Sequence, residues 1–84
     1  MSEAATSSEI LENVVAAIVE INPDLEASAI ALETPFEDID IDSLDLVEIA
    51  QILGDKYDVE LKSDELDEGA KVGDAVALIA RATA

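Results

Sequence analysis

The side chains able to do chemistry in this chain are few, because it contains no cysteine and no histidine. One hydroxyl stands out, that of Ser43 in the segment Asp42-Ser43-Leu44, where an acidic stretch gives way to an amphipathic pattern. A nucleophilic serine requires a general base, and the sequence offers neither a histidine nor a Gly-x-Ser-x-Gly turn. Ser43 is therefore interpreted as a position for covalent attachment and not as a catalyst.

Two structural interpretations of Ser43 stay open from its neighbours alone. In the first, its side chain caps the helix that follows, and Asp38, Asp40 and Asp42 are simply solvated. In the second, the hydroxyl carries a phosphodiester, which the amide groups and the dipole of a helix N-terminus would favour. An exposed loop would let a modifying enzyme reach the residue.

A third possibility is a calcium loop, because Asp38, Asp40 and Asp42 have the spacing of the first three ligands of an EF-hand. That motif next requires glycine and, at its last position, glutamate, whereas this chain has Ser43 and Ile49. We therefore predict no specific metal site. An acidic helical module that binds cations or regulates a partner through the three aspartates is kept as the alternative function.

Apolar residues recur at helical spacing, which predicts a small all-α bundle. We expect a long loop at 22–42, a mobile tail at 1–6 and a single domain at 7–84. The main helices are expected at 7–21, 43–57 and 72–82, with a short third helix within 63–68.

The residues expected to be buried follow from this periodicity. Gly54 should weaken the second helix by about 1 kcal/mol relative to alanine. The buried residues are Ile10, Leu11, Val14, Val15, Ile18 and Ile21 in the first helix; Leu25, Ile30, Leu32, Phe36 and Ile39 in the loop; Leu46, Ile49, Ala50, Leu53 and Tyr57 in the second helix; and Val72, Ala75, Val76 and Ile79 in the last.

The charge of the chain is extreme, with 21 acidic against 4 basic residues and a net charge of −17. Nucleic acid and anionic lipid should be repelled, and partners with basic patches should be attracted. No apolar run is long enough to span a membrane, and the absence of cysteine is compatible with a reducing compartment. We expect a cytoplasmic monomer.

The stretch from Asp42 to Glu48, DSLDLVE, resembles the attachment motif of discrete (type II) acyl carrier proteins. Val59-Glu60-Leu61 resembles the apolar anchor that follows the second helix in that family, and the segment 72–76 resembles the start of its last helix. The resemblance covers the chain from about Ile10 to Ile79.

The resemblance implies that a phosphopantetheinyl transferase moves 4′-phosphopantetheine from coenzyme A onto Ser43. The thiol of that arm would carry acyl groups as thioesters between ketosynthase, acyltransferase and other enzymes of fatty-acid or polyketide synthesis. The protein would be a carrier that biosynthetic enzymes use as a substrate, and not itself an enzyme.

Further roles carry over from the family by position. Partner recognition would fall to Asp42, Leu44, Asp45, Val47, Glu48 and Gln51, whose acids would meet basic side chains of the partners. The candidates for lining a space for the acyl chain are Leu53, Leu61, Leu66, Ala75 and Ile79.

Several positions depart from the family pattern. Asp40 replaces a usual glycine, so it is expected to adopt a positive φ, which aspartate tolerates better than most residues. Lys71 stands where a threonine cap is common, so the last helix is expected to begin less firmly. Lys62 replaces a frequent proline, and Gly69 a usual apolar residue. Phe36, seven residues before Ser43, resembles polyketide carriers, whereas Val59-Glu60-Leu61 resembles fatty-acid carriers, and the choice stays open.

Overall fold

The computed structural model describes residues 7–61, 66 and 69–83. Its elements are α1 (Ser7–Ile21), the 3-10 turns η1 (Ala27–Ala29) and η2 (Phe36–Ile39), α2 (Ser43–Tyr57) and α3 (Val72–Thr83). The predicted all-α class and the bounds of α1 and α2 are confirmed, and α3 extends one residue beyond its predicted end at 82. The predicted tail at 1–6, the departure at Lys62 and most of the predicted short helix at 63–68 lie outside the described residues. The single-domain boundary at 7–84 stays a prediction.

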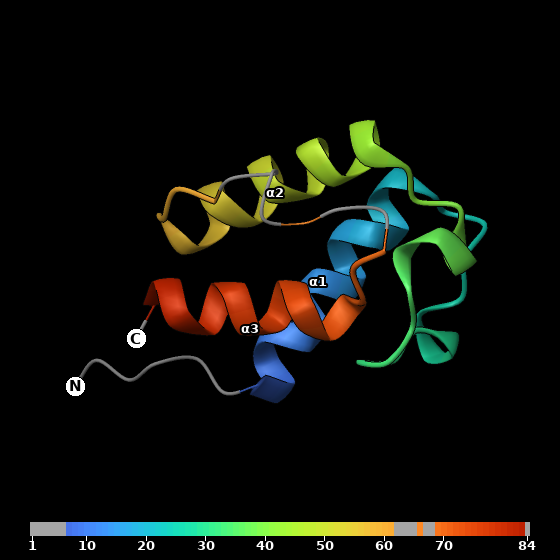
Figure 1. Cartoon of the computed structure of the whole chain (residues 1–84), viewed down its shortest axis with the longest axis horizontal. Helices are drawn as coiled ribbons and strands as arrows, with labels where there is room; N and C mark the ends of the chain where they lie inside the picture. Colours follow the sequence, from blue (N-terminus) through green and yellow to red (C-terminus); the bar gives the residue numbers. More distant parts are fainter. Residues whose placement is uncertain (1–6, 62–65, 67–68, 84) are drawn as a thin grey trace.

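Helix α1 is the centre of the molecule, because both α2 and α3 pack against it (Figure 1). Its predicted apolar stripe is confirmed: Ile10, Val14 and Ile18 are fully buried, and the neighbouring apolar side chains of the stripe are partly buried against the same core. None of the helices within the described ranges is long and apolar enough to cross a membrane.

Helix α2 buries the predicted face made by Leu46, Ile49, Ala50 and Leu53. The last predicted member, Tyr57, is only partly buried, and its hydroxyl accepts a hydrogen bond from Asn13 Nδ2 at 2.6 Å. This bond ties the end of α2 to α1. Helix α3 buries all four predicted residues and, in addition, Leu78.

The connection between α1 and α2 is fixed to the core by Ile30, Phe36 and Ile39, as predicted, whereas Leu25 is partly buried. The prediction for Leu32 is wrong, since its side chain is 44% exposed. The residue is held through its backbone, because its carbonyl oxygen accepts the N–H of Gly73 at 2.8 Å. A Cβ on Gly73 would lie 2.9 Å from that oxygen, so the close approach requires glycine there.

The start of α3 is also held by this connection. The N–H of Val72 donates to the carbonyl of Thr34 at 2.9 Å, and the N–H of Phe36 donates to the carbonyl of Ala70 at 3.0 Å. The N–H of Lys71 donates to Oδ2 of Asp74 at 2.9 Å. The Asp74 carboxylate thus serves the amide of Lys71, and loop carbonyls serve the amides of Val72 and Gly73. The expected loss of stability at this helix start stays a prediction.

Candidate functional site

Ser43 is the first residue of α2, and its side chain is exposed. The interpretation of Ser43 as the helix cap is wrong, because the cap is Asp42. Asp42 has extended backbone angles, φ −94° and ψ −176°, whereas Ser43 already lies within the helix. A capping side chain acts from the residue before the first helical turn, and Ser43 stands one position too late.

Asp42 and Asp45 cap the helix reciprocally. Oδ1 of Asp42 accepts the N–H of Asp45 at 3.0 Å, and Oδ2 of Asp45 accepts the N–H of Asp42 at 3.3 Å. Both carboxylates also lie at the positive end of the helix dipole, which stabilises them. The Ser43 hydroxyl takes no part in this capping. None of the described residues makes a hydrogen bond to it, and Ser43 is exposed to solvent.

The turn before α2 aims Ser43 outward. Asp40 adopts the left-handed conformation, with φ 57° and ψ 32°, as its position in the motif predicted. The N–H of Ile41 donates to the carbonyl of Phe36 at 3.1 Å, and the Ile41 side chain is buried to 2% exposure. Sequence reasoning missed this anchor. The alternation of Ile39 and Ile41 between aspartates was the available signal, since apolar side chains in an acidic loop need burial.

An attached phosphate would fit at this position. The first four N–H groups of an α-helix have no partner within the helix. In α2 these four groups belong to Asp42, Ser43, Leu44 and Asp45. The Asp45 carboxylate accepts the N–H of Asp42, and the Asp42 carboxylate accepts the N–H of Asp45. The amides of Ser43 and Leu44 receive no hydrogen bond acceptor from the described part of the chain, so they remain for an anion bonded to the Ser43 oxygen.

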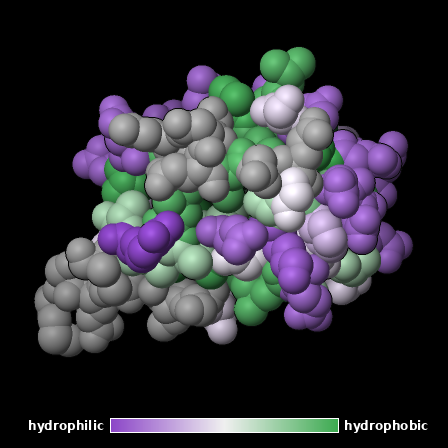
Figure 2. Space-filling view, viewed as in Figure 1, coloured by the Kyte–Doolittle hydropathy of each residue, from purple (hydrophilic) through white to green (hydrophobic). Residues whose placement is uncertain are grey.

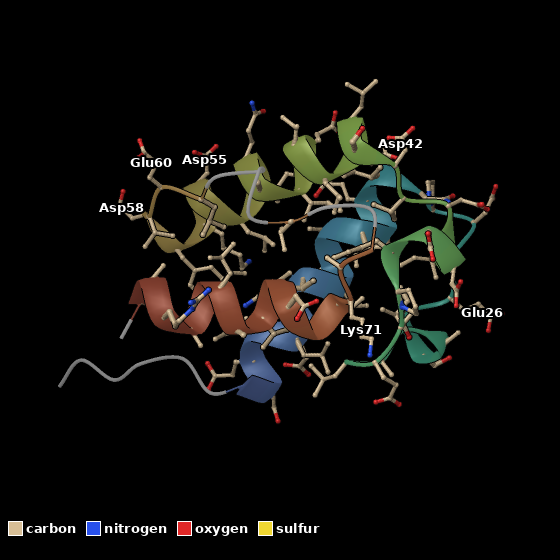
Figure 3. The ribbon with its side chains drawn as sticks, in the orientation of Figure 1. Glu26, Asp42, Asp55, Asp58, Glu60 and Lys71 are labelled. Carbon is tan, nitrogen blue, oxygen red and sulfur yellow. The ribbon has the colours of Figure 1, made fainter. Side chains whose placement is uncertain are left out.

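The surface around Ser43 combines apolar and acidic side chains. Leu44 is 79% exposed and Val47 is 40% exposed, while Glu48 and Gln51 are exposed on the same helix. Asp45 is partly buried. Figure 3 labels Asp42 at the start of α2, with its side chain pointing away from the core. Exposed leucine and valine beside carboxylates form a surface suited to a protein partner.

The acidic residues of the preceding turn do not form a metal site. Among the described residues, which include Asp38, Asp40 and Asp42, no three acidic side chains are grouped so that they could hold a metal ion.

The candidates for the acyl space are brought together. Leu53, Leu66, Ala75 and Ile79 belong to one buried cluster, and Leu61 packs against its edge while remaining partly exposed. These residues come from α2, α3 and the segment between them, so the structure gathers what the resemblance implied. Their contact with an acyl chain stays a prediction.

Comparison with known proteins gives a consistent result. The family model described as "Phosphopantetheine attachment site" matches residues 9–79. The meromycolate extension acyl carrier protein of Mycolicibacterium smegmatis is 43% identical over 77 residues, which cover 90% of this chain and 77% of that protein. The protein of the same name from Mycobacterium tuberculosis H37Rv is 43% identical over 72 residues, covering 81% of this chain and 63% of that protein. No solved structure matches the chain significantly.

Proposed function

The chain belongs to the family of proteins with a phosphopantetheine attachment site and is an acyl carrier protein, and on that premise we propose that Ser43 is the residue that bears 4′-phosphopantetheine. The observation that carries the proposal is that the cap of α2 is Asp42 and not Ser43. Asp42 caps the helix, so the Ser43 hydroxyl is exposed and has no structural duty.

In the proposed loading step, the Ser43 oxygen attacks the phosphate of coenzyme A that bears the pantetheine. A new O–P bond forms, the phosphoanhydride bond breaks, and the adenosine bisphosphate part leaves. The hydroxyl proton passes to a base of the transferase. The amides of Ser43 and Leu44 would then stabilise the attached phosphodiester.

The group supplies the thiol that the polypeptide lacks, and acyl chains are carried on it as thioesters. The chain's own contribution is recognition. We infer that Leu44 and Val47 enter small apolar depressions on the transferase and the synthesis enzymes, while Asp42, Glu48 and Gln51 face basic or polar side chains around them. Exposed ion pairs contribute about 0–1 kcal/mol each, which permits rapid release after each step.

We infer that the cargo consists of fatty-acyl intermediates under extension, with polyketide intermediates as the second candidate. The relatives named above are carriers of meromycolate extension, which favours the first. We further infer that Leu53, Leu61, Leu66, Ala75 and Ile79 would flank an acyl chain that enters between α2 and α3. A cytoplasmic location and a monomeric state stay predictions.

Incubation with coenzyme A, magnesium and a broad-specificity phosphopantetheinyl transferase should add the mass of one phosphopantetheine to the intact protein. Ser43→Ala should abolish this addition and leave the circular dichroism spectrum unchanged. Ser28→Ala is the matched control, because Ser28 is an exposed serine in η1, and this variant should be modified like the original protein. Modification that persists in Ser43→Ala would refute the assignment.

A further inference from the structure

A second surface feature lies on α1, and it shares no residue with the surface around Ser43. A groove of about 400 Å³ runs between α1 and η1, which pack against each other. Nearly all of its lining is apolar, and contiguous apolar patches on a protein surface often mark an interaction site. Leu11, Val15, Ala16 and Val19 of α1 form one wall, and Ala27 of η1 and Ile30 contribute to the other.

Helix α1 carries two apolar rows, and only one of them is covered by α2 and α3. Ile10, Val14 and Ile18 recur every four positions and are fully buried. The row Leu11, Val15 and Val19 repeats one position later and is only partly buried. It is turned about 100° around the helix from the first row, where a surface helix ordinarily carries polar side chains. The second row is therefore a face that the described residues cover only in part.

The turn η1 forms the other wall and leaves the groove open. The N–H of Ile30 donates to the carbonyl of Ala27 at 3.1 Å, and the N–H of Ala29 donates to the carbonyl of Glu26 at 3.0 Å. Ile30 is buried and fixes the turn to the core. Ala16 and Ala27, on the two walls, are exposed. Because their side chains are single methyl groups, the backbone of a ligand can approach both walls closely.

The rim of the groove is acidic. Glu12 is one of its lining residues, Glu26 directly precedes η1, and both are exposed. Figure 3 labels Glu26 at the outer edge of the connection, and Figure 2 shows hydrophilic side chains gathered over the connection on the right of the molecule. The first basic residue of the chain is Lys56, so α1 and η1 carry no basic side chain. An occupant should therefore turn apolar side chains to the groove and positive charges to its rim.

We propose that this groove is a docking site for an amphipathic helix of a partner protein, which inserts leucine-like side chains and sets lysine or arginine beside them. Such a helix binds a groove through apolar side chains that repeat every three or four positions. Leu11 and Val19 are eight positions apart, or about 12 Å along α1, which matches about two turns of a partner helix. A second copy of this chain is disfavoured by its own net charge of −17.

Docking at α1 would hold the carrier and leave Ser43 available. The groove and the surface around Ser43 consist of different residues, so one protein can retain the carrier through α1 while another reacts at Ser43. Retention raises the effective concentration of the carrier at the second protein without a stronger contact there. The docking itself does not depend on what Ser43 carries.

The probe is a synthetic peptide of about 18 residues, with leucine at helical spacing and lysine on both sides of the leucine row. A peptide of the same composition in scrambled order is its control, because it keeps the charge and loses the apolar face. In nuclear magnetic resonance spectra of the isotope-labelled protein, the probe should shift the amide signals of Val15, Ala16, Val19 and Ala27. An absence of these shifts, equal shifts with the scrambled peptide, or shifts confined to Leu44 and Val47 would overturn the proposal.

A matched pair of variants tests the groove itself. Ala16→Gln places a longer polar side chain in the groove, and Ala77→Gln makes the same change at an exposed alanine of α3. Glutamine is a good helix former, so both variants should keep the fold. The dissociation constant of the probe should rise about fivefold or more for Ala16→Gln and less than about twofold for Ala77→Gln. Equal dissociation constants for the two variants would contradict docking in the groove.

Further measurements exclude other occupants. The probe should leave the dissociation constant of the unmodified protein for a phosphopantetheinyl transferase unchanged within about twofold, and competition between them would overturn the proposal. Shifts of the same amides on raising the protein concentration would identify a second copy as the occupant, and shifts on acylation of the arm would identify the cargo. Either result would overturn the proposal. Failure of Ser43 to be loaded would refute only the function of Ser43, because the probe is applied to the unmodified protein.

Discussion

At the scale of single residues, the site depends on Asp42 and Ser43 having different roles: Asp42 caps α2, and Ser43 stays exposed. Adjacent residues that both have the chemistry of a cap differ in backbone conformation, and only the extended one reaches the third amide of the helix. The serine is thereby left exposed without loss of helix stability. Modification of a capping serine would by contrast have removed a contact that the helix needs.

Because only Asp42 caps the helix, substitution of Asp42 and substitution of Ser43 should lower the free energy of unfolding by different amounts. Asp42→Ala should lower the free energy of unfolding by about 1 kcal/mol, because the amide of Asp45 loses its acceptor. Ser43→Ala should change it by less than about 0.5 kcal/mol, as is usual for an exposed position. Urea unfolding followed by circular dichroism measures both values. A larger loss for Ser43→Ala than for Asp42→Ala would contradict the assignment of the cap.

At the scale of elements, glycine at 54 illustrates a competition between helix propensity and tertiary contact. Propensity alone says that alanine should stabilise α2 by about 1 kcal/mol. The Cβ would however meet the Val59 carbonyl oxygen at 2.8 Å, and that atom belongs to backbone, which cannot rotate away. The close contact outweighs the gain in propensity.

Gly54→Ala is therefore expected to lower the melting temperature. Gln51→Ala serves as the control, because Gln51 is exposed on the same helix and alanine there should be neutral or slightly stabilising. Differential scanning calorimetry compares the two variants. A melting temperature of Gly54→Ala at or above that of the original protein would mean that the segment 59–61 does not lie where the structure has it.

The elements also show what sequence reasoning can and cannot reach. The helices were predictable because their apolar residues repeat every three or four positions, a pattern that only a buried helical face requires. In the connection the side-chain directions were predictable only in part. Ile30, Phe36 and Ile39 were assigned to the core correctly, but η1, η2 and the left-handed Asp40 break the periodicity that would extend the assignment to every residue. Leu32 therefore points outward and Ile41 inward.

The candidate site divides in the same way. The motif around Ser43 identified the residue. The choice between Asp42 and Ser43 as the cap depends on their backbone angles, which cannot be read from the residue types. The groove on α1 was likewise out of reach, since it depends on where η1 lies against that helix.

At the scale of the whole molecule, charge sets the balance between partner attraction and self-repulsion. The net charge of −17 is carried by a compact chain, whose Cα radius of gyration is 11.7 Å. At 0.01 M salt the screening length is about 30 Å, so carboxylates on opposite sides repel one another, whereas at 0.15 M it is about 8 Å. The compact state is therefore least favourable at low salt.

The melting temperature should rise as sodium chloride is increased from 0.01 to 0.15 M (about 30 to 8 Å of screening length). Addition of an uncharged solute at matched osmolality is the control, and it should have a smaller effect because it does not screen. A melting temperature that stays constant across this range would show that self-repulsion does not limit stability.

The central claim is that the Ser43 oxygen bears the phosphopantetheine, and it is tested most directly by tandem mass spectrometry of the protein purified from the organism that makes it. Fragmentation should place the added mass on the peptide that contains Asp42-Ser43-Leu44, at the serine itself. The same mass located on any other residue would contradict the account.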